Sequence, residues 1–176
     1  MDKQQQEYLA ELFEQWSGKA PEQITPLPKS GSDRLYARLS AGELSAIGAY
    51  NSDEAENRAF VAFTRHFQER QLAVPQLYAT DLDRHVYLQE DLGDQTLLMA
   101  LQSARQESGE AFPQSIRGLY EASLSELARL QVIGGKELDF SLSYPRAQFD
   151  ATAMGWDLNY FKYFFFKLPG LSFHEQ

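Results

Sequence analysis

The pattern of hydrophobic and polar residues predicts that the chain begins with a helix. Apolar residues recur at helical spacing over residues 8–16, with Gln and Glu between them, and Gly18 is a typical residue to end such a helix. Residues 19–28 contain three prolines, which favour an extended backbone. We therefore expect an amphipathic helix that packs on another element, followed by an extended segment.

The next part of the chain follows the pattern of antiparallel strands. Apolar Leu35, Ala37 and Leu39 alternate with Tyr36 and Arg38, which is the period of a half-buried strand. A glycine then predicts a turn into a second extended run, Leu-Ser-Ala-Ile-Gly-Ala-Tyr. Together with the proline-containing segment, these runs predict three consecutive strands that pair with their neighbours.

A helix and a hairpin are expected next. Residues 51–53 predict a helix start, and apolar residues at helical spacing continue to about Gln71. Runs over residues 76–80 and 85–90, separated by a polar turn, predict two paired strands. The expected first half of the chain therefore holds five strands, with one helix inserted after the third.

Helical patterns replace strand patterns after the hairpin. A short apolar pattern predicts a helix that starts at Asp94 or Thr96 and ends before a polar loop over residues 102–112. A longer helix is expected over residues 116–131, and a third over residues 148–168. The fold class predicted from the pattern is α+β, with strands in the first half and helices in the second.

Composition and charge narrow the class of protein. The chain has 176 residues, of which 43% are hydrophobic, and this is enough to form a packed core. Its formal charge is −9 with no block of Lys and Arg, so nucleic acid is not an expected partner. It has no cysteine and no signal-peptide pattern, and its most apolar run, residues 160–166, is too short to span a bilayer. We therefore expect a cytoplasmic protein without a membrane partner.

Two local features point to ligand binding, and each has a structural explanation as well. Ser30, Gly31 and Ser32 are small, so their backbone N–H groups would be accessible to an anion, although a polar hairpin explains them equally. Glu56 lies on the apolar face of the inserted helix, where a carboxylate needs a cation or hydrogen-bond donors. It also lies at the helix start, where the helix dipole favours an anion.

A series of short motifs resembles the aminoglycoside phosphotransferase superfamily. In chain order the motifs are Gly31-Ser-Asp-Arg-x-Tyr-x-Arg38, Glu56-Asn-x-x-Phe60, Val74-Pro75 and Tyr87-Leu-x-Glu-Asp-Leu-Gly-Asp-x-Thr-Leu97. The similarity covers roughly residues 24–170. The chain is most similar to the branch of sugar kinases that phosphorylate N-acetylmuramate and N-acetylglucosamine at the anomeric hydroxyl.

The resemblance implies a protein-kinase-like fold. An amphipathic helix over residues 1–18 would precede a kinase-like N-lobe over residues 19–92, made of a five-stranded antiparallel sheet with one inserted helix. Residues 93–176 would form the first helices of an α-helical C-lobe. Between the lobes, a cleft would run from the loop at 30–34 to the hinge at 90–92.

The resemblance also implies that ATP and Mg²⁺ are cofactors and that a sugar-like molecule accepts the phosphoryl group. The loop at 30–34 would cover the phosphates, Glu56 would be the carboxylate of the inserted helix, and the hinge backbone at 90–92 would contact adenine. The residues that the resemblance assigns to ATP binding are Ser30, Gly31, Ser32, Asp33, Arg34, Arg38, Glu56, Glu90, Asp91 and Leu92.

Two departures from the family pattern bear on catalysis. Protein kinases place a Lys on the third strand to contact the phosphates, but the run at 44–50 has none, so Arg34 or Arg38 is the candidate replacement. The catalytic pattern His-x-Asp-x-x-x-x-Asn follows none of the three histidines, and Asp139-Phe-Ser is expected to be a loop rather than a metal-binding motif. We therefore expect no catalytic residue and no magnesium ligand in this chain, which is expected to be the inactive N-terminal piece of a longer kinase.

The aromatic residues near the end of the chain carry a further expectation. A helix that is apolar on all sides must be covered on all sides, and large apolar patches are rarely left exposed. Packing into a core is one explanation of this segment. Because a partial lobe offers few partners, we also expect self-association through residues 154–173.

Three functional hypotheses remain open. The leading hypothesis is the ATP-binding lobe and partial substrate lobe of a small-molecule phosphotransferase, acting on a sugar or amino sugar when full length. The alternative is a non-catalytic, pseudokinase-like regulator that binds a nucleotide or a protein, and the missing Lys favours it. The third is an interaction domain without a ligand.

Overall fold

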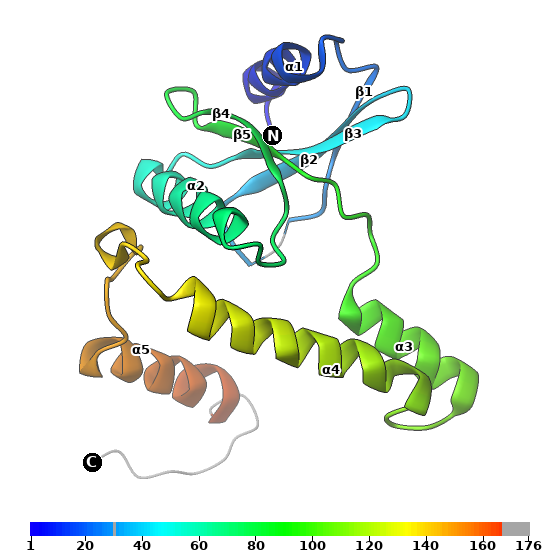
Figure 1. Cartoon of the computed structure of the whole chain (residues 1–176), viewed down its shortest axis with the longest axis vertical. Coiled ribbons are helices and arrows are strands. Elements are labelled where there is room, and N and C mark those ends of the chain that lie inside the picture. Colours follow the sequence, from blue (N-terminus) through cyan, green and yellow to red (C-terminus); the bar gives the residue numbers. More distant parts are fainter. Residues whose placement is uncertain (30, 167–176) are drawn as a thin grey trace. The chain divides into compact units, whose positions relative to one another are not determined.

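The computed structural model describes residues 1–29 and 31–166, which form an α+β fold in two compact units, Met1–Leu138 and Asp139–Gln176. The first unit holds a helix, a five-stranded antiparallel sheet with one inserted helix, and two further helices; the last helix lies in the second unit (Figure 1). The predicted fold class is confirmed at this level. The predicted boundaries after residues 18 and 92 stay a prediction.

The first helix, α1 (Lys3–Ser17), has a capped start and ends where its sequence predicts. Asp2 accepts a hydrogen bond from the backbone N–H of Gln5, and the Gln5 side chain accepts one from the backbone of Asp2, which is a reciprocal capping box. Gly18 ends the helix with φ 73°, a left-handed conformation that glycine adopts without strain. The predicted amphipathic helix is confirmed.

The sheet follows the predicted order of strands. Its neighbours pair antiparallel in the order β1-β2-β3-β5-β4, so β1 to β3 form a meander and β4 pairs with β5 as a hairpin. The strands are β1 (Gln23–Pro26), β2 (Leu35–Ala41), β3 (Leu44–Tyr50), β4 (Leu77–Asp81) and β5 (Val86–Gln89).

One face of the sheet packs on α1 to form the main core. Along β2 and β5 every second side chain points to this face, and these side chains are apolar. At Gly48 the approach is so close that an added Cβ would lie 2.7 Å from Leu39 Cδ1 and 2.8 Å from Leu9 Cδ2. The buried residues of this core are Leu9, Leu12, Phe13, Ala37, Leu39, Ala41, Ala46, Val86 and Leu88.

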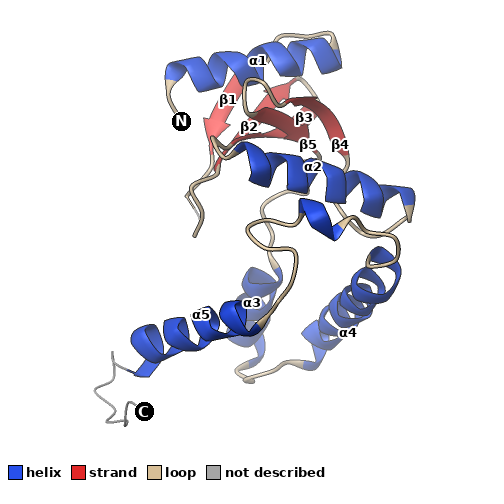
Figure 2. Ribbon diagram, turned by 90° about the vertical axis from the view of Figure 1, so that its left-hand side faces the viewer, coloured by secondary structure: helices blue, strands red, loops and turns tan. Residues whose placement is uncertain are grey.

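The inserted helix, α2 (Glu54–Glu69), lies on the opposite face of the sheet (Figure 2). Asp53 caps its N-terminus by accepting a hydrogen bond from the backbone N–H of Glu56, as the sequence predicts. The Phe60 ring of α2 stacks on the Tyr87 ring of β5, with 4.7 Å between the ring centroids. The sheet is therefore covered by α1 on one face and in part by α2 on the other.

The helices after the sheet differ from the prediction in one place. α3 (Leu97–Ser108) is capped by Thr96, and it continues through residues 102–108, where a polar loop was expected. That expectation is wrong because the polar residues at the end of α3 face solvent and are compatible with helix, while Gly109, with φ 73°, ends it.

A longer helix follows as predicted. α4 (Gln114–Arg129) continues as a π-helical segment, Leu130–Gly134. The glycine at its end meets Phe67 and Leu72, so the end of this helix packs near the end of α2. The expected long helix over residues 116–131 is confirmed.

The described part of the second unit holds a 3₁₀ turn, Phe140–Leu142, and α5 (Ala151–Phe161), which continues as a π-helical segment, Lys162–Phe166. The side chain of Asp139 accepts hydrogen bonds from the Ser141 backbone and hydroxyl groups, so this segment forms a tight turn. The predicted third helix is confirmed as far as the structure describes it, and residues 167–176 lie outside the described part.

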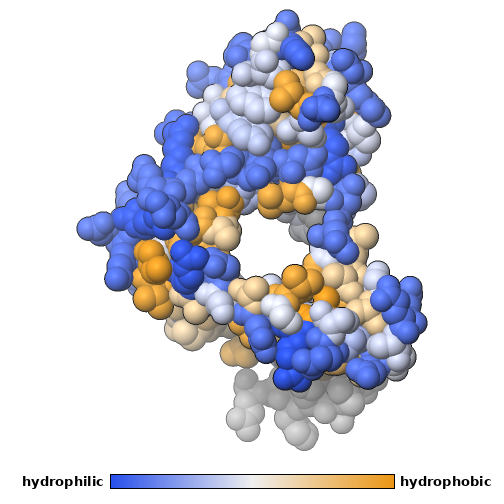
Figure 3. All heavy atoms as spheres, turned by 45° about the vertical axis from the view of Figure 1, so that its right-hand side comes forward, coloured by the Kyte–Doolittle hydropathy of each residue, from blue (hydrophilic) through white to orange (hydrophobic). Residues whose placement is uncertain are grey.

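Exposed aromatic side chains are concentrated on the second unit. Trp156, Tyr160, Phe164 and Phe165 each expose about half or more of their surface, and Tyr160 stacks on Phe164. Figure 3 shows hydrophobic residues at the surface of the helices that follow the sheet. In the described residues, none of the helices has the length and hydrophobicity needed to cross a membrane.

Candidate functional site

The candidate site lies on the α2 face of the sheet, beyond the part that α2 covers. Strand register places Arg38, Ile47 and Gln89 in one row across β2, β3 and β5. The neighbouring row holds Tyr36 and Tyr87, and Phe60 of α2 stacks on the second of these. The row with Arg38 therefore lies next to the part of the sheet that α2 covers. It also borders the segment that follows the end of β5.

A groove of about 250 Å³, here named the corner groove, lies where β5 ends and the chain turns at residues 90–94. Its walls combine apolar side chains with polar groups from the corner, which is the usual composition of a small-molecule site. The corner groove is lined by Leu27, Tyr36, Arg38, Ile47, Pro75, Gln89, Glu90, Leu92, Gly93 and Asp94.

A second groove of about 180 Å³, here named the loop groove, lies beside the loop that precedes β2. Lys29 and Arg34 give it two cationic side chains. Leu27 and Tyr36 line both grooves, so the two grooves adjoin at these residues. The loop groove is lined by Met1, Pro26, Leu27, Lys29, Arg34, Leu35 and Tyr36.

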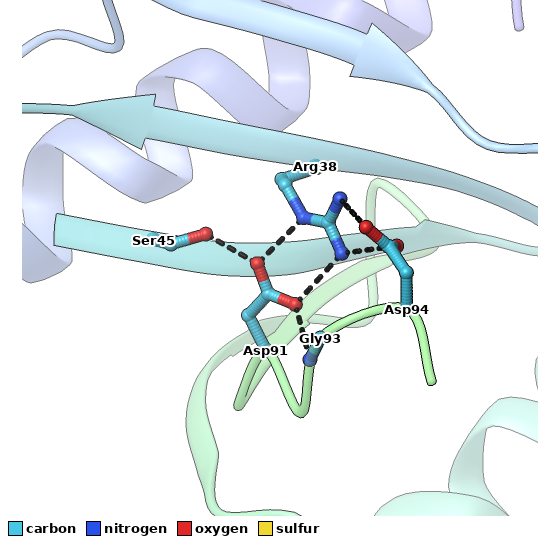
Figure 4. A network of polar contacts seen from close by, with 5 residues as sticks. All are labelled: Arg38, Ser45, Asp91, Gly93 and Asp94. Carbon is cyan, nitrogen blue, oxygen red and sulfur yellow. Dashed lines mark hydrogen bonds and ion pairs between the residues drawn. The ribbon is translucent and has the colours of Figure 1, made fainter. Parts of the chain in front are cut away.

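A network of ion pairs fastens the corner to the sheet (Figure 4). Arg38 Nε donates to Asp91 Oδ2 at 2.6 Å, and Nη2 donates to Asp91 Oδ1 at 3.0 Å, so this pair is bidentate. Arg38 also donates to both carboxylate oxygens of Asp94, at 2.8 and 3.1 Å. The Ser45 hydroxyl and the Gly93 backbone N–H donate to Asp91 as well.

These contacts settle the charge state of the network. The hydrogen bonds from Arg38, and then those from Ser45 and Gly93, lower the pKa of Asp91 from 3.8 to about 2. The same contacts raise the pKa of Arg38. Because two carboxylates already occupy its guanidinium, Arg38 acts in this structure as the anchor of the corner rather than as an unpaired cation.

Arg34 forms the second ion pair of the site. Its Nη2 donates to Glu56 Oε1 at 2.8 Å, and Asn51 Nδ2 donates to Glu56 Oε2 at 2.6 Å. The guanidinium carbon of Arg34 lies 5.1 Å from the Phe60 ring centroid, within the range of a cation–π contact. The expectation that Glu56 needs a cation or donors is confirmed, and of the two candidate arginines it is Arg34 that pairs with it.

Only some of the remaining predicted site residues line the adjoining grooves. At the corner, Glu90 binds the residue that precedes β4, because its N–H donates to the Gln76 carbonyl and its carboxylate accepts from the Gln76 N–H. Leu92 lines the corner groove with an exposed side chain. In the loop, Gly31, Ser32 and Asp33 are exposed and line neither groove, and Ser30 lies outside the described residues.

Sequence reasoning missed three members of the site: Ser45, Asn51 and Asp94 as an ion-pair partner. Asn51 carried a signal, because it stands at a helix start five residues before Glu56, but it was taken only as part of the cap. The sequence gives no such signal for Ser45 or Asp94. The contact of Ser45 with Asp91 and that of Asp94 with Arg38 depend on how β2, β3 and the corner meet in the folded protein.

A larger groove, of about 440 Å³, lies between α3 and α4. Its walls are mainly apolar, and Glu126 is its one ionisable group, which forms an ion pair with Arg129. Across residues 1–29 and 31–166, no group of three potential metal ligands comes together. The corner and loop grooves therefore offer the more distinctive chemistry.

No model of a known protein family matches the chain, and no curated protein matches it either.

Proposed function

We propose that the sheet-containing unit is the nucleotide-binding lobe of a small-molecule phosphotransferase, of the protein-kinase-like kind that the sequence motifs resemble. The observation that carries this proposal is the junction of the corner and loop grooves at Leu27 and Tyr36. It connects Arg34 with Glu90 and Leu92, which belong to the two segments to which the resemblance assigns the opposite ends of one ATP molecule.

The charges along the joined grooves favour one orientation of ATP. Lys29 and Arg34 line the loop groove, where the phosphates would be held by cations. The corner groove has apolar walls at Leu27, Ile47 and Pro75, which suit the faces of a purine base. The base would therefore lie at the corner and the phosphates beside the loop.

Arg34 fits the role of the Lys that β3 lacks. In protein kinases a Lys contacts the phosphates while it pairs with a Glu of the inserted helix. Here Arg34 pairs with Glu56 of α2 at 2.8 Å and lines the loop groove at the same time. A guanidinium can bind a carboxylate and a phosphate with different N–H groups, so the exchange of Lys for Arg is chemically reasonable.

The proposed acceptor of the phosphoryl group follows from the resemblance alone. A sugar or amino sugar is proposed for the full-length protein, with Mg²⁺ as the second cofactor. No step of phosphoryl transfer is assigned to residues of this chain, because it contains no His-x-Asp-x-x-x-x-Asn pattern.

A second candidate is a non-catalytic regulator that binds a nucleotide or a protein through the same lobe. The absence of Lys from β3, Leu44–Tyr50, favours it. Transfer of the γ-phosphate of ATP to an N-acetylated amino sugar by the full-length protein supports the kinase. Nucleotide binding without such transfer supports the regulator.

A thermal-shift titration with Mg-ATP tests nucleotide binding by this chain. At a concentration about 100 times Kd, binding adds about 2.7 kcal/mol of stability, which corresponds to a rise in Tm of roughly 5–10 °C for a protein of this size. Lys29→Gln is expected to weaken ATP binding about fivefold and to leave adenosine binding unchanged, since it removes one contact to phosphate.

The matched control is Lys19→Gln, which removes the same charge from another exposed position, outside both grooves. It should bind ATP as the wild type does. A wild-type chain whose Tm does not respond to Mg-ATP contradicts the proposal and favours an interaction domain without a ligand.

A further inference from the structure

Gln89 places a polar side chain where the pattern of the sheet would allow an apolar one. It is the last residue of β5, and its neighbour Leu88 packs in the α1 core. Alternation along the strand therefore puts Gln89 on the opposite face, in the row with Arg38 and Ile47. There it lines the corner groove.

The amide oxygen of Gln89 is buried and has no hydrogen-bond partner among the described residues. Its direct neighbours across the strands are Ile47 on β3 and Leu77 on β4, and neither side chain can donate a hydrogen bond. A buried acceptor without a donor destabilises the protein that carries it. A ligand in the groove with a suitably placed N–H would remove this penalty.

A second acceptor lies next to it in the chain. The N–H of Glu90 donates to the Gln76 carbonyl, whereas no backbone N–H in the described part of the chain donates to the Glu90 carbonyl. An exocyclic amino group has two N–H bonds and can donate to two acceptors at once. The Gln89 side chain and the Glu90 backbone together offer such a pair.

We propose that Gln89 determines which nucleobase the corner groove accepts, because its amide oxygen accepts a hydrogen bond from the 6-amino group of adenine. This inference rests on the proposed function, namely that a nucleotide binds with its base in the corner groove. Hypoxanthine carries a carbonyl oxygen in place of that amino group. Hypoxanthine would face the Gln89 oxygen with another acceptor unless the amide rotated to present its N–H₂ group, and binding of hypoxanthine is therefore disfavoured.

The test compares the binding of Mg-ATP and Mg-ITP, which differ in the base alone. Isothermal titration calorimetry gives both Kd values for the whole chain, for Gln89→Met and for Gln102→Met. Methionine is unbranched and similar in volume to glutamine, so the change removes the amide without leaving a cavity. Gln102 is exposed on α3 and provides the same substitution away from the groove.

The wild type and Gln102→Met are expected to bind ATP about tenfold more tightly than ITP. In Gln89→Met the preference should fall below about threefold, through weaker binding of ATP. If Gln89→Met keeps the wild-type preference, or if the wild type shows none, the base is recognised without Gln89 and this inference is overturned while the proposed function stands. If the wild type binds neither nucleotide, the proposed function and the inference are both overturned.

Should Gln89→Met fail to fold, Gln89→Glu provides a second variant. An ionised carboxylate has only acceptors and cannot rotate to present an N–H to the base. The preference for ATP over ITP should then be kept or increased at neutral pH. A reversal toward ITP overturns the inference.

Discussion

Asp91 is the residue through which the corner is attached to the sheet. It accepts hydrogen bonds from Arg38 of β2, from Ser45 of β3 and from the backbone of Gly93 in its own loop. Only 12% of its side chain is exposed, so solvent screens these contacts weakly. Of the contacts that hold the predicted hinge, those of Asp91 reach two strands, whereas Asp94 binds Arg38 alone among the described residues.

The lowered pKa of Asp91 predicts how stability depends on pH. A carboxyl group with a pKa of about 2 in the folded protein and 3.8 when unperturbed stabilises the folded state above pH 3.8. This contribution is lost as pH falls toward 2, and it amounts to at most about 2 kcal/mol. Asp91→Asn should therefore be less stable than the wild type at neutral pH and should approach it in acid.

Urea unfolding between pH 7 and pH 2 measures this difference. The control Asp83→Asn makes the same change at an exposed residue of the turn between β4 and β5, and Asp83 itself forms no ion pair with any described residue. Its difference from the wild type should be small throughout. A deficit of Asp91→Asn that stays constant down to pH 2 would show that its cause is not the ionised Asp91.

Two glutamates in the first turn of α2 allow a matched test of the Arg34 ion pair. Glu54→Gln breaks an exposed pair with Arg58 and should change the free energy of unfolding by less than about 0.5 kcal/mol. Glu56→Gln leaves the buried Arg34 without its carboxylate and should cost about 1–2 kcal/mol, reduced by the partial exposure of Glu56. Equal effects of the two variants would mean that only the helix dipole matters.

At the scale of single residues, the sequence predicted which side chain requires an ion-pair partner better than it predicted which residue that partner is. The place of Glu56 on an apolar helix face indicated that it requires a cation, because local periodicity fixes which face a residue occupies. The partner of Arg38 was not predictable, since Asp91 lies 53 positions away and reaches it only through the folded sheet. Burial and ion pairing between distant segments are properties of the tertiary structure.

Among the elements, α1 packs tightly against β3 at Gly48 in the core. An added Cβ at Gly48 would lie within 2.8 Å of side-chain atoms of Leu39 and Leu9, so one of these must move. Gly48→Ala is therefore expected to destabilise the protein by roughly 1–3 kcal/mol. Chemical denaturation is the appropriate measurement.

The same substitution should have the opposite sign on α4. Gly118 lies in the interior of that helix with nothing within 4 Å of an added Cβ. Gly118→Ala should stabilise the protein by up to about 1 kcal/mol, because alanine has the higher helix propensity. A Gly48→Ala variant as stable as Gly118→Ala would contradict the close packing of α1 on the sheet.

The type of an element was predictable where the period of its hydrophobic residues and its capping residues indicate the same structure. The capping residues Asp53 and Thr96 and the glycine at position 18 stand where the sequence places helix ends. The end of α3 was not found, because its last residues are polar and a solvent-facing helix end has the same composition as a loop. There the glycine at position 109 was the better signal.

At the scale of the whole molecule, the exposed aromatic surface of α5 predicts association between copies. Sedimentation velocity over a range of concentrations should show a reversible increase in mass, since large apolar patches seldom remain exposed. The double substitution Tyr160→Glu and Phe164→Glu changes two rings that stack at 4.5 Å and expose more than half their surface. It should shift the equilibrium toward monomer.

Phe149→Glu is the control, because Phe149 is also exposed in the second unit but lies before residues 154–173. It should associate as the wild type does. A mass that is independent of concentration in the wild type would contradict self-association through this segment. Residues 167–173 lie outside the described structure, so the test concerns the described part of α5 and the segment that follows it.

The central claim is that a nucleotide binds along the joined grooves, and amide NMR shifts test it most directly. In a titration of the chain with Mg-ATP, the N–H signals of Leu92, Gly93 and Lys29 should shift together as one binding event. Signals of Ser123 and Glu126, which line the groove between α3 and α4, should stay in place. Shifts confined to that second groove, or no shifts at millimolar ATP, would contradict the account.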